Sequence, residues 1–369
     1  MVDNTSNKTI LILTAQFGAG HVSAANAVKD YILEKNPHCN IVIENFITAS
    51  IPTMNQPLVK WYEINTKYIP GLYNYYYYLK KSFDSKKDIA SKIYTPKLAK
   101  YIVDVNPDII ISTFPLACAC IDQLKSKYPD INIPSITVVT DVVDSLEWIY
   151  DSTNMYFVPS CEIKNRYIQK GINPDIIKVT GVPVGKDFCN DKVLNNNKYK
   201  ILLVGGGRGL FDMDTSFFYY LDNLLNTNLN NLEITIVCGK NAKLYNKLTK
   251  KHPLKNIQVL GFVNNMPDLL KEHNLIVTKP GGATLFEAIH AQVPVIVKLP
   301  KIGQEIENAR FIIDKGIGIV YNDDNDLKEI FNSLLNKSIN NRVHFMIDNI
   351  INLKKTIHLD KIADYILEL

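Results

Sequence analysis

The stretch Thr278-Lys-Pro-Gly-Gly-Ala-Thr-Leu-Phe-Glu-Ala288 decides how the second half of the chain is interpreted. The apolar run 274–278 before the glycines predicts a strand, and the periodic run 285–291 after them predicts a helix. Gly281 and Gly282 therefore lie in a strand-to-helix turn, where the backbone can approach a bound group closely. The amides that open the helix point at that group, so the turn suits a phosphate.

Glu287 lies on the first turns of the same predicted helix. A carboxylate there does not help to bind phosphate, but it accepts hydrogen bonds from sugar hydroxyls. The turn and the acid together predict a nucleotide site, with the diphosphate on the amides and the ribose on Glu287. A plain strand-to-helix turn with a capping or solvated glutamate is the alternative, and this stretch alone favours neither reading.

The bulk composition indicates an ordinary globular protein. The 369 residues favour two domains, and the hydrophobic content of 46% provides full cores. The net charge of +4 is too small to indicate nucleic acid, but it is compatible with an anionic membrane surface or substrate. The six cysteines have neither zinc-knuckle nor C-x-x-C spacing, so we expect free thiols in a reducing compartment.

The sequence also indicates where in the cell the protein is located. The start, Met1 to Lys8, is polar and does not read as a signal peptide, and no run approaches the length of a membrane span. We therefore expect a cytoplasmic protein whose membrane contact is peripheral, on the inner face of the cell membrane. Nothing in the sequence indicates the oligomeric state.

Apolar runs and helical patterns alternate along most of the chain, which predicts an α/β fold of two Rossmann-like domains facing across a cleft. We place an N-terminal domain at 1–185, a C-terminal domain at 200–350 and a C-terminal helix at 351–369 that returns to the first domain. The predicted strands are 9–13, 40–44, 108–112, 135–140, 155–159, 177–180, 200–204, 233–238, 257–260, 274–278 and 294–299, the last clear one.

The turn after the first strand presents His21. Gly18-x-Gly20 with Glu44 some 20 residues on suggests a dinucleotide site, but the third glycine is missing. His21 instead stands at a helix start, where the positive dipole lowers its pKa and suits it to act as a general base. Asp141, at the end of another strand, could orient it or cap a helix. A capping or packing role for His21 is the alternative.

A second glycine turn, Gly205 to Gly209, follows the strand 200–204. Amides of Gly206 and Gly207 could bind an anion and Arg208 could neutralise it, whereas a tight turn with a solvated arginine is nearly as plausible. Asp212-x-Asp214 lies at a helix start, and Asn322 to Asp326 is no full calcium loop, so we expect no metal site and no cofactor.

An insertion at 51–98 interleaves aromatic residues with lysines, among them Trp61, Tyr62, Lys80 and Lys81. Amphipathic rings and cations together suit the headgroup region of an anionic membrane. A helical insertion with half-buried tyrosines is a serious alternative, and stacking on single-stranded nucleic acid is a weaker one.

In this order, the motifs resemble a known family: the monogalactosyldiacylglycerol synthases and the bacterial processive diacylglycerol glucosyltransferases. These are similar in turn to the transferase that adds N-acetylglucosamine in lipid II assembly. The resemblance runs from about residue 9 to 320, and rests on 13–21, 138–141 with Trp148, 156–160, 179–184, 205–207, 261–263, 278–282 with Glu287, and 303–308.

The resemblance implies a GT-B fold and an inverting transfer of a hexose from a UDP-sugar to a membrane lipid, most simply diacylglycerol or a glycosyl-diacylglycerol. It implies His21 as base, with Gly20 and Trp148 on the acceptor side. The implied donor residues are Phe262 and Val263 beside the uracil, Glu287 on the ribose, Gly206, Gly207, Gly281 and Gly282 at the diphosphate, with Arg208 and Thr284, and Gln304, Glu305 and Asn308 near the donor sugar.

The chain departs from the family at 142–148, where many members have a histidine shortly before the tryptophan and this sequence has none. Ala283 also replaces a larger residue often found after the glycine pair, which bears on donor preference. A nucleotide-sugar-binding protein or a UDP-sugar epimerase of the same fold, with no lipid acceptor, is the alternative function. The missing third glycine disfavours an NAD enzyme.

Overall fold

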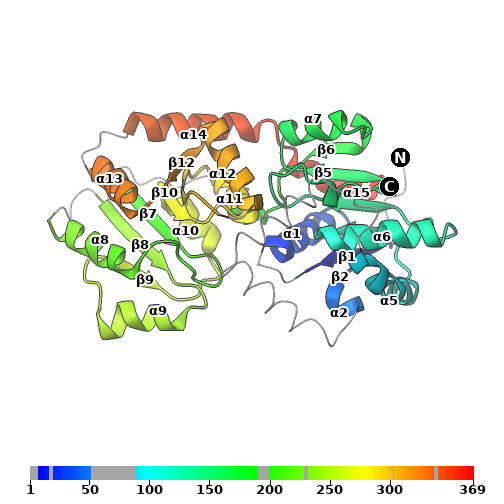
Figure 1. Cartoon of the computed structure of the whole chain (residues 1–369), viewed down its shortest axis with the longest axis horizontal. Helices are drawn as coiled ribbons and strands as arrows, with labels where there is room; N and C mark the ends of the chain where they lie inside the picture. Colours follow the sequence, from blue (N-terminus) through cyan, green and yellow to red (C-terminus); the bar gives the residue numbers. More distant parts are fainter. Residues whose placement is uncertain are drawn as a thin grey trace. The chain divides into compact units, whose positions relative to one another are not determined.

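A computed structural model describes residues 7–15, 20–50, 89–189, 199–227, 232–301, 303–335 and 340–369 (Figure 1). It divides into two compact units. The first comprises Met1–Gly185, Lys301–Gln304 and Thr356–Leu369, and the second Lys186–Pro300 and Glu305–Lys355. Most of the predicted insertion, with Trp61, Tyr62, Lys80 and Lys81, lies outside the described residues.

The described part of the first unit is built on a parallel sheet of six strands in the order β2-β1-β3-β4-β5-β6. The strands are β1 (Thr9–Thr14), β2 (Asn40–Asn45), β3 (Ile109–Ser112), β4 (Ser135–Val138), β5 (Met155–Val158) and β6 (Ile177–Val179). The helices are α1 (Gly20–Lys35), α2 (Phe46–Ser50), α5 (Ile89–Val105), α6 (Pro115–Lys127), α7 (Cys161–Gln169) and α15 (Ile362–Leu367), with the short turns η3 (Leu146–Trp148), η4 (Pro174–Ile176) and η7 (Leu359–Lys361).

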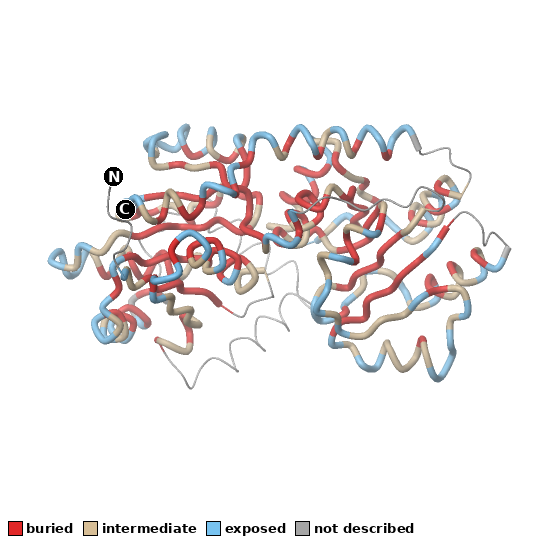
Figure 2. The backbone as a smooth tube through the Cα atoms, turned by 180° about the vertical axis from the view of Figure 1, so that it is seen from behind, coloured by how far each residue is buried: buried red, intermediate tan, exposed pale blue. Residues whose placement is uncertain are grey.

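Burial on both faces explains why the first strand reads as a continuous apolar run. Leu11 in β1 pairs with Val42 of β2 on one side and Ile110 of β3 on the other. Ile10 to Leu13 have no exposed surface, since helices cover both faces of a parallel sheet. Figure 2 shows most of the strands coloured as buried, whereas the helices also carry exposed residues.

The described part of the second unit holds another six-stranded parallel sheet, in the order β12-β11-β10-β7-β8-β9. The strands are β7 (Tyr199–Val204), β8 (Leu232–Val237), β9 (Gln258–Leu260), β10 (Leu275–Thr278), β11 (Val295–Lys298) and β12 (Gly318–Tyr321). The helical segments are η5 (Lys186–Cys189), α8 (Thr215–Thr227), α9 (Ala242–Asn246), η6 (Lys247–Lys251), α10 (Met266–Glu272), α11 (Gly282–His290), α12 (Gly303–Lys315), α13 (Asp324–Leu335) and α14 (Asn340–Lys354).

The strand β12 follows the run 294–299, the last clear strand in the sequence, and was not among the predicted strands. Its sequence, Gly-Ile-Val-Tyr, is short and starts with a glycine, so its periodicity is weak. Pairing decides the matter, because Ile319 and Val320 lie opposite Ile296 and Val297 of β11. A Cβ at Gly318 would meet the backbone oxygen of Val295 at 2.2 Å, so the glycine permits the close approach.

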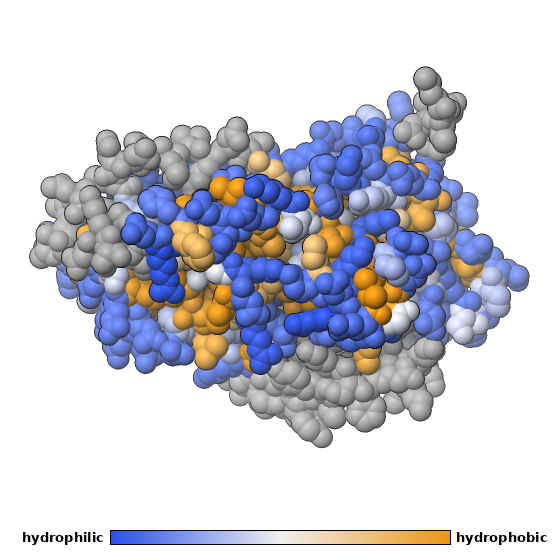
Figure 3. All heavy atoms as spheres, turned by 90° about the horizontal axis from the view of Figure 1, so that it is seen from above, coloured by the Kyte–Doolittle hydropathy of each residue, from blue (hydrophilic) through white to orange (hydrophobic). Residues whose placement is uncertain are grey.

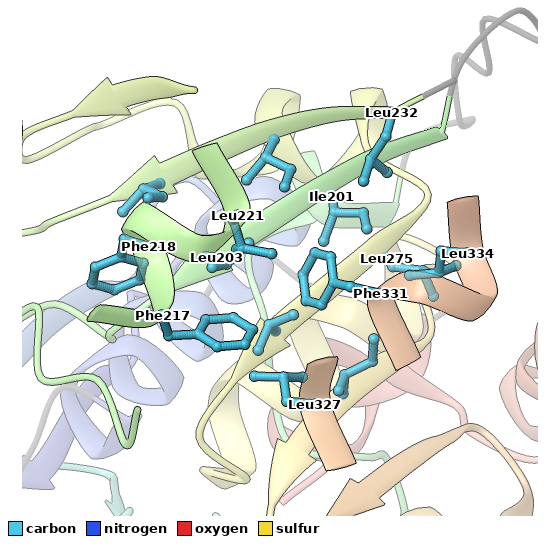
Figure 4. Packing of buried hydrophobic residues seen from close by; sticks show 14 of the residues in the cluster. Ile201, Leu203, Phe217, Phe218, Leu221, Leu232, Leu275, Leu327, Phe331 and Leu334 are labelled. Atoms are coloured by element: carbon cyan, nitrogen blue, oxygen red, sulfur yellow. The ribbon is translucent and has the colours of Figure 1, made fainter. Parts of the chain in front are cut away.

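Aromatic and aliphatic side chains from α8 and α13 pack on one face of the second sheet (Figure 4). Phe217 lies with its ring centroid 5.8 Å from that of Phe331, and Leu221 and Leu327 are fully buried beside them. These contacts explain the apolar periodicity of both helices. A separate core in the first unit packs α2, α5 and α6 against β1 and β3.

In each sheet the first strand in sequence lies between neighbours reached in opposite directions. β1 lies between β2 and β3, and β7 lies between β8 and β10. The chain leaves β1 towards β2 but leaves β3 towards β4, and it leaves β7 towards β8 but β10 towards β11. Ligands of such sheets bind at the carboxyl ends of the strands where the connections diverge in this way. The start of α1, the turn 205–209 and the turn 279–282 follow β1, β7 and β10, the strands at these two positions. The sequence motifs thus fall where ligands bind in such sheets.

The end of the chain returns to the first unit, as expected. α15 packs against α1, and Lys35 of α1 pairs with Asp364 at 2.9 Å. Ile362 and Ile366 have no exposed surface, and the ring of Tyr365 lies 6.2 Å from that of Phe157 in β5. The C-terminal residues therefore complete the core of the N-terminal sheet.

Among the described residues, no helix combines the length and the apolar character that a membrane crossing requires. On the face drawn in Figure 3, hydrophobic residues lie in separate patches among hydrophilic ones. The exposed large apolar side chains belong to several elements, including Ile93 and Val103 of α5 and Phe345 of α14.

Replacing Ile366 by alanine should lower the free energy of unfolding by about 2–5 kcal/mol, because it leaves a cavity beneath α15. Leu369→Ala, at a side chain that is 38% exposed in the same tail, should change it by less than about 0.5 kcal/mol. Urea denaturation measures both values. Equal effects would show that α15 does not pack as the structure has it.

Candidate functional site

The turn between β10 and α11 has the features of an anion site. α11 begins at Gly282, three residues before the predicted start, so the glycine itself opens the helix. Gly281 is the N-cap, has no side chain to cap the first amides, and faces open space, since a Cβ there would meet no atom within 4 Å. Thr284 lies in the first turn. The positive end of the helix dipole and these amides suit a phosphate oxygen.

Asn308 holds this turn in place from α12. Its side chain has no exposed surface, and its Nδ2 donates a hydrogen bond of 2.8 Å to the carbonyl oxygen of Pro280. Gln304 and Glu305 precede it by one helical turn and are partly exposed, so all three start from the same side of α12. The structure thus brings Asn308 to the glycine turn, and assigns it a positioning contact that the motif did not specify.

The second glycine turn interlocks with the loop after β8. Gly209 has a φ of 63°, and a Cβ there would overlap the carbonyl oxygen of Cys238 at 1.8 Å, so only glycine fits. The amide of Lys240 donates to the carbonyl of Gly207 at 3.0 Å. Gly206 instead faces open space, and Arg208 is exposed. The loop after β8 therefore fixes the turn on the side of Gly207 and Gly209, whereas Gly206 and Arg208 remain accessible.

An ion pair links the two glycine turns. Lys279 Nζ lies 3.0 Å from Asp212 Oδ1, and Lys298 Nζ donates to the carbonyl of Asp212 at 2.8 Å. Neither contact could be predicted from the local sequence. Asp212 thus has a structural role between the two glycine turns. Within the described residues, no group of three acidic, histidine or cysteine side chains is arranged to hold a metal ion.

The acidic residues after β7 and β12 line a common cavity of about 350 Å³. Asp214 and Asp324 lie on its wall, and Lys298 reaches within 3.8 Å of Asp324 Oδ1. The lysine partly balances the acidic wall. Nothing in the local sequence pattern shows that β7 and β12 end at the same edge, so the sequence alone does not connect these two acidic stretches.

Phe262 stands exposed at the same edge of the second sheet. It follows β9 directly, and 57% of its surface is accessible. Lys240 Nζ lies 5.7 Å from the ring centroid, so the ring carries a cation on one side. Val263 beside it is partly exposed. An accessible aromatic face near an anion site suits the base of a nucleotide.

The carboxyl group of Glu287 is suited to accept hydrogen bonds from uncharged donors such as hydroxyl groups. Burial raises the pKa of its carboxyl from 4.5 to about 7. Among the described residues, no side chain donates a hydrogen bond or a counter-charge to this carboxyl group. A ligand that donates hydroxyl hydrogen bonds would stabilise the ionised form and lower the pKa. The geometry therefore suits a ribose diol one helical turn beyond the phosphate turn.

His21 lies in the first turn of α1, at the carboxyl edge of the first sheet. Its Nδ1 is 2.9 Å from Thr140 Oγ1, just beyond β4. Its ring packs edge-on against Phe114, with centroids 5.3 Å apart, and lies 6.5 Å from the ring of Trp148. The carboxyl ends of β1, β3 and β4 thus supply a wall around one imidazole.

Burial lowers the pKa of His21 from 6.5 to about 4, and a hydrogen bond to the Thr113 backbone opposes that shift. The direction agrees with the sequence-based expectation, but the cause is desolvation, whereas the expectation invoked the helix dipole. The imidazole is therefore neutral at physiological pH and can accept a proton. Gly20, which opens α1, is partly exposed beside it.

Asp141 is partly buried, and its carbonyl accepts the amide of Val143 at 2.9 Å. The residue whose side chain reaches the imidazole nitrogen is its neighbour Thr140, which the sequence analysis did not single out. Phe114 was missed too, because its position after β3 becomes informative only when the sheet order is known. Trp148 is 2% exposed, so it forms part of the wall.

The chain matches two family models over most of its length. Residues 21–184 match the monogalactosyldiacylglycerol synthase model. Residues 201–355 match the C-terminal domain of glycosyltransferase family 28. The first match falls within the first unit, and the second falls within the second unit apart from Lys301–Gln304.

Individual proteins are similar over nearly the whole chain. A processive diacylglycerol beta-glucosyltransferase of Staphylococcus haemolyticus is 31% identical over 348 residues, which is 90% of this chain and 86% of that protein. A protein of the same name from Staphylococcus carnosus is 30% identical over 325 residues, 85% of this chain and 81% of the other.

Two solved structures share the fold. Acinetobacter baumannii MurG matches with a TM-score of 0.63 and 16% identity, over 98% of this chain and all of that chain. The UDP-GlcNAc 2-epimerase of Neisseria meningitidis matches with a TM-score of 0.57 and 15% identity, over 98% of both chains. At these identities the likeness concerns the fold alone, which is the GT-B arrangement of two Rossmann-like units.

Replacing Glu287 by glutamine should make the protein more stable at pH 8 and leave it unchanged at pH 4.5. Because folding raises the pKa of Glu287, the native state of the unchanged protein loses stability as pH rises from 4.5 through about 7. The shift corresponds to about 2 kcal/mol after allowance for partial exposure. Urea denaturation at both pH values measures this difference.

Glu329→Gln, on the exposed side of α13 in the same unit, provides the control and should show no such pH-dependent gain. A gain for Glu287→Gln that is equal at both pH values would contradict the raised pKa.

Proposed function

Because the chain belongs to the family of monogalactosyldiacylglycerol synthases and processive diacylglycerol glucosyltransferases, we propose that it moves a hexose from a UDP-sugar to diacylglycerol or a glycosyl-diacylglycerol. It is a UDP-sugar-dependent glycosyltransferase that acts on diacylglycerol. The inverting course of the transfer and the chemical form of the acceptor belong to the proposal.

The observation that carries the proposal on the donor side is the pairing, on one helix, of an open glycine turn with a carboxyl group whose pKa is raised. Gly281 and Gly282 would receive the diphosphate, and Glu287 the ribose hydroxyls. Gly206, Gly207 and Arg208 would approach the diphosphate from the neighbouring turn. Phe262 and Val263 would flank the uracil, and Thr284, Gln304 and Glu305 would lie near the phosphates and the sugar.

On the acceptor side, His21 would remove the proton from the attacking lipid hydroxyl. Its neutral imidazole, next to Thr140 Oγ1, supports that role. The hydroxyl oxygen forms a bond to the anomeric carbon as the bond to the UDP oxygen breaks, which inverts the configuration. Asp141, Gly20 and Trp148 would shape the acceptor side.

The leaving UDP needs charge stabilisation. Helix-start amides and Arg208 would supply it, so the proposed reaction uses no resident metal or other cofactor. Fixed amides aimed at the diphosphate need no reorganisation as negative charge develops on the leaving oxygen.

The protein would bind the inner face of the cell membrane peripherally. The lysines and aromatic residues of 51–98, among them Trp61, Tyr62, Lys80 and Lys81, favour an anionic lipid surface. A lipid acceptor requires such access, whereas an epimerase or a nucleotide-sugar-binding protein requires none. The family matches favour the transferase over these alternatives.

A donor scan on vesicles tests the proposal. Purified protein is mixed with UDP-glucose, UDP-galactose, UDP-N-acetylglucosamine or UDP-glucuronic acid, and UDP release is followed on vesicles with and without diacylglycerol. We expect release that needs one donor and diacylglycerol together, and that is faster on anionic than on neutral vesicles. Conversion of the UDP-sugar to its epimer without lipid would instead establish the alternative function.

His21→Ala should reduce kcat by about 10²–10⁴-fold, because it removes the base. In the unchanged protein, kcat/KM for the acceptor should fall on the acid side near pH 4, below the usual range of histidine, because His21 must be neutral to act. His38→Ala, at an exposed histidine of the same unit, should leave both unchanged. Undiminished transfer by His21→Ala would refute the mechanism.

A further inference from the structure

The segment that joins β4 to β5 carries two of the groups around His21. Thr140 at its start lies 2.9 Å from the imidazole, and Trp148 lies with its ring 6.5 Å away. Between them, η3 (Leu146–Trp148) is the one short helical turn, so backbone hydrogen bonds alone define little of the path. We call residues 140–148 the acceptor-side segment.

Two cationic side chains at the end of α7 bind Asp144, in the middle of this segment. Lys170, just after α7, donates through Nζ to both the carbonyl oxygen of Asp144 and its Oδ2, the latter at 2.9 Å. Arg166 Nη1, one helical turn earlier, lies 3.8 Å from Asp144 Oδ1. The Asp144 side chain is only 15% exposed, so solvent weakens its ion pairs with these cations less than it would at the surface.

The interior beneath the segment cannot replace those cations. Ser145 and Tyr167 have no exposed surface, and their hydroxyl oxygens have no hydrogen-bond partner among the described residues. Neutral hydroxyls do not balance a carboxylate. Without Lys170, the mostly buried carboxylate of Asp144 would lose its closest cation, and the segment would shift to hydrate it.

We propose that Asp144 is a positioning residue for the acceptor side. Its ion pairs with Lys170 and Arg166 fix the acceptor-side segment, so that Thr140 and Trp148 stay next to His21. This inference rests on the proposed function for its kinetic consequence, but not for its structural one. The ion pair and the backbone contact from Lys170 fix the path of the segment at Asp144.

The structural consequence is measured by tryptophan fluorescence. The chain has two tryptophans, so Trp61→Phe leaves Trp148 as the only one, and this background serves for fluorescence alone. Trp148 is 2% exposed and should be quenched weakly by acrylamide. Asp144→Asn and Lys170→Met should each raise the quenching constant at least threefold, and the double variant should add little to either.

The matched control is Lys164→Met on the same helix. Lys164 Nζ donates to the carbonyl of Ile177 in β6 at 3.0 Å, so it anchors α7 to the sheet and not to the segment. Its loss should leave the quenching of Trp148 unchanged. A rise as large as that of Lys170→Met would overturn the inference, because general loosening of α7 would then explain both.

The kinetic consequence separates positioning from folding. Asp144→Asn in the otherwise unchanged protein should lower kcat/KM for the lipid acceptor about tenfold and leave the Kd for UDP unchanged, and Asp144→Glu should recover part of the loss. Unchanged quenching, or an equal loss of UDP affinity, would overturn the inference. If the unchanged protein shows no transfer with any donor while the quenching differences persist, the proposed function fails and the structural inference stands.

Discussion

The structure depends on one constraint of parallel sheets: where the connections from two adjacent strands turn in opposite directions, neither covers the space between their carboxyl ends. In the first unit β1 leads to β2 and its neighbour β3 to β4, and in the second unit β7 leads to β8 and its neighbour β10 to β11. Backbone amides and short side chains thereby reach an otherwise packed edge. The glycine turns and His21 all depend on that opening.

Burial then sets the chemistry at each edge. The pKa of His21 falls to about 4 and that of Glu287 rises to about 7, both because their charged forms lose solvation. The same cause thus produces a neutral base in one unit and a carboxyl in the other that responds to hydrogen-bond donors. Each group gains its role from the surrounding wall, Phe114 and Trp148 for His21, and the packed body of α11 for Glu287.

Contacts between segments distant in sequence hold these groups in place. Asn308 fixes Pro280 from α12, Lys279 joins Asp212 across the two glycine turns, and Lys170 grips Asp144 beneath the acceptor side. The two residues of each pair lie between different pairs of consecutive strands. A local pattern cannot reveal such pairs, because lysine and aspartate at these positions equally suit a solvated surface.

The sequence by itself determined the α/β class, eleven of the strands, the glycine turns and the family, since continuous apolar runs and glycine positions are fixed by local geometry. It also led to His21 and Glu287. Only the tertiary structure decided that β12 is a strand, that Thr140 and Phe114 meet His21, and that Lys170 and Arg166 hold Asp144. These depend on which strands become neighbours, and strand order is set by packing across the whole sheet.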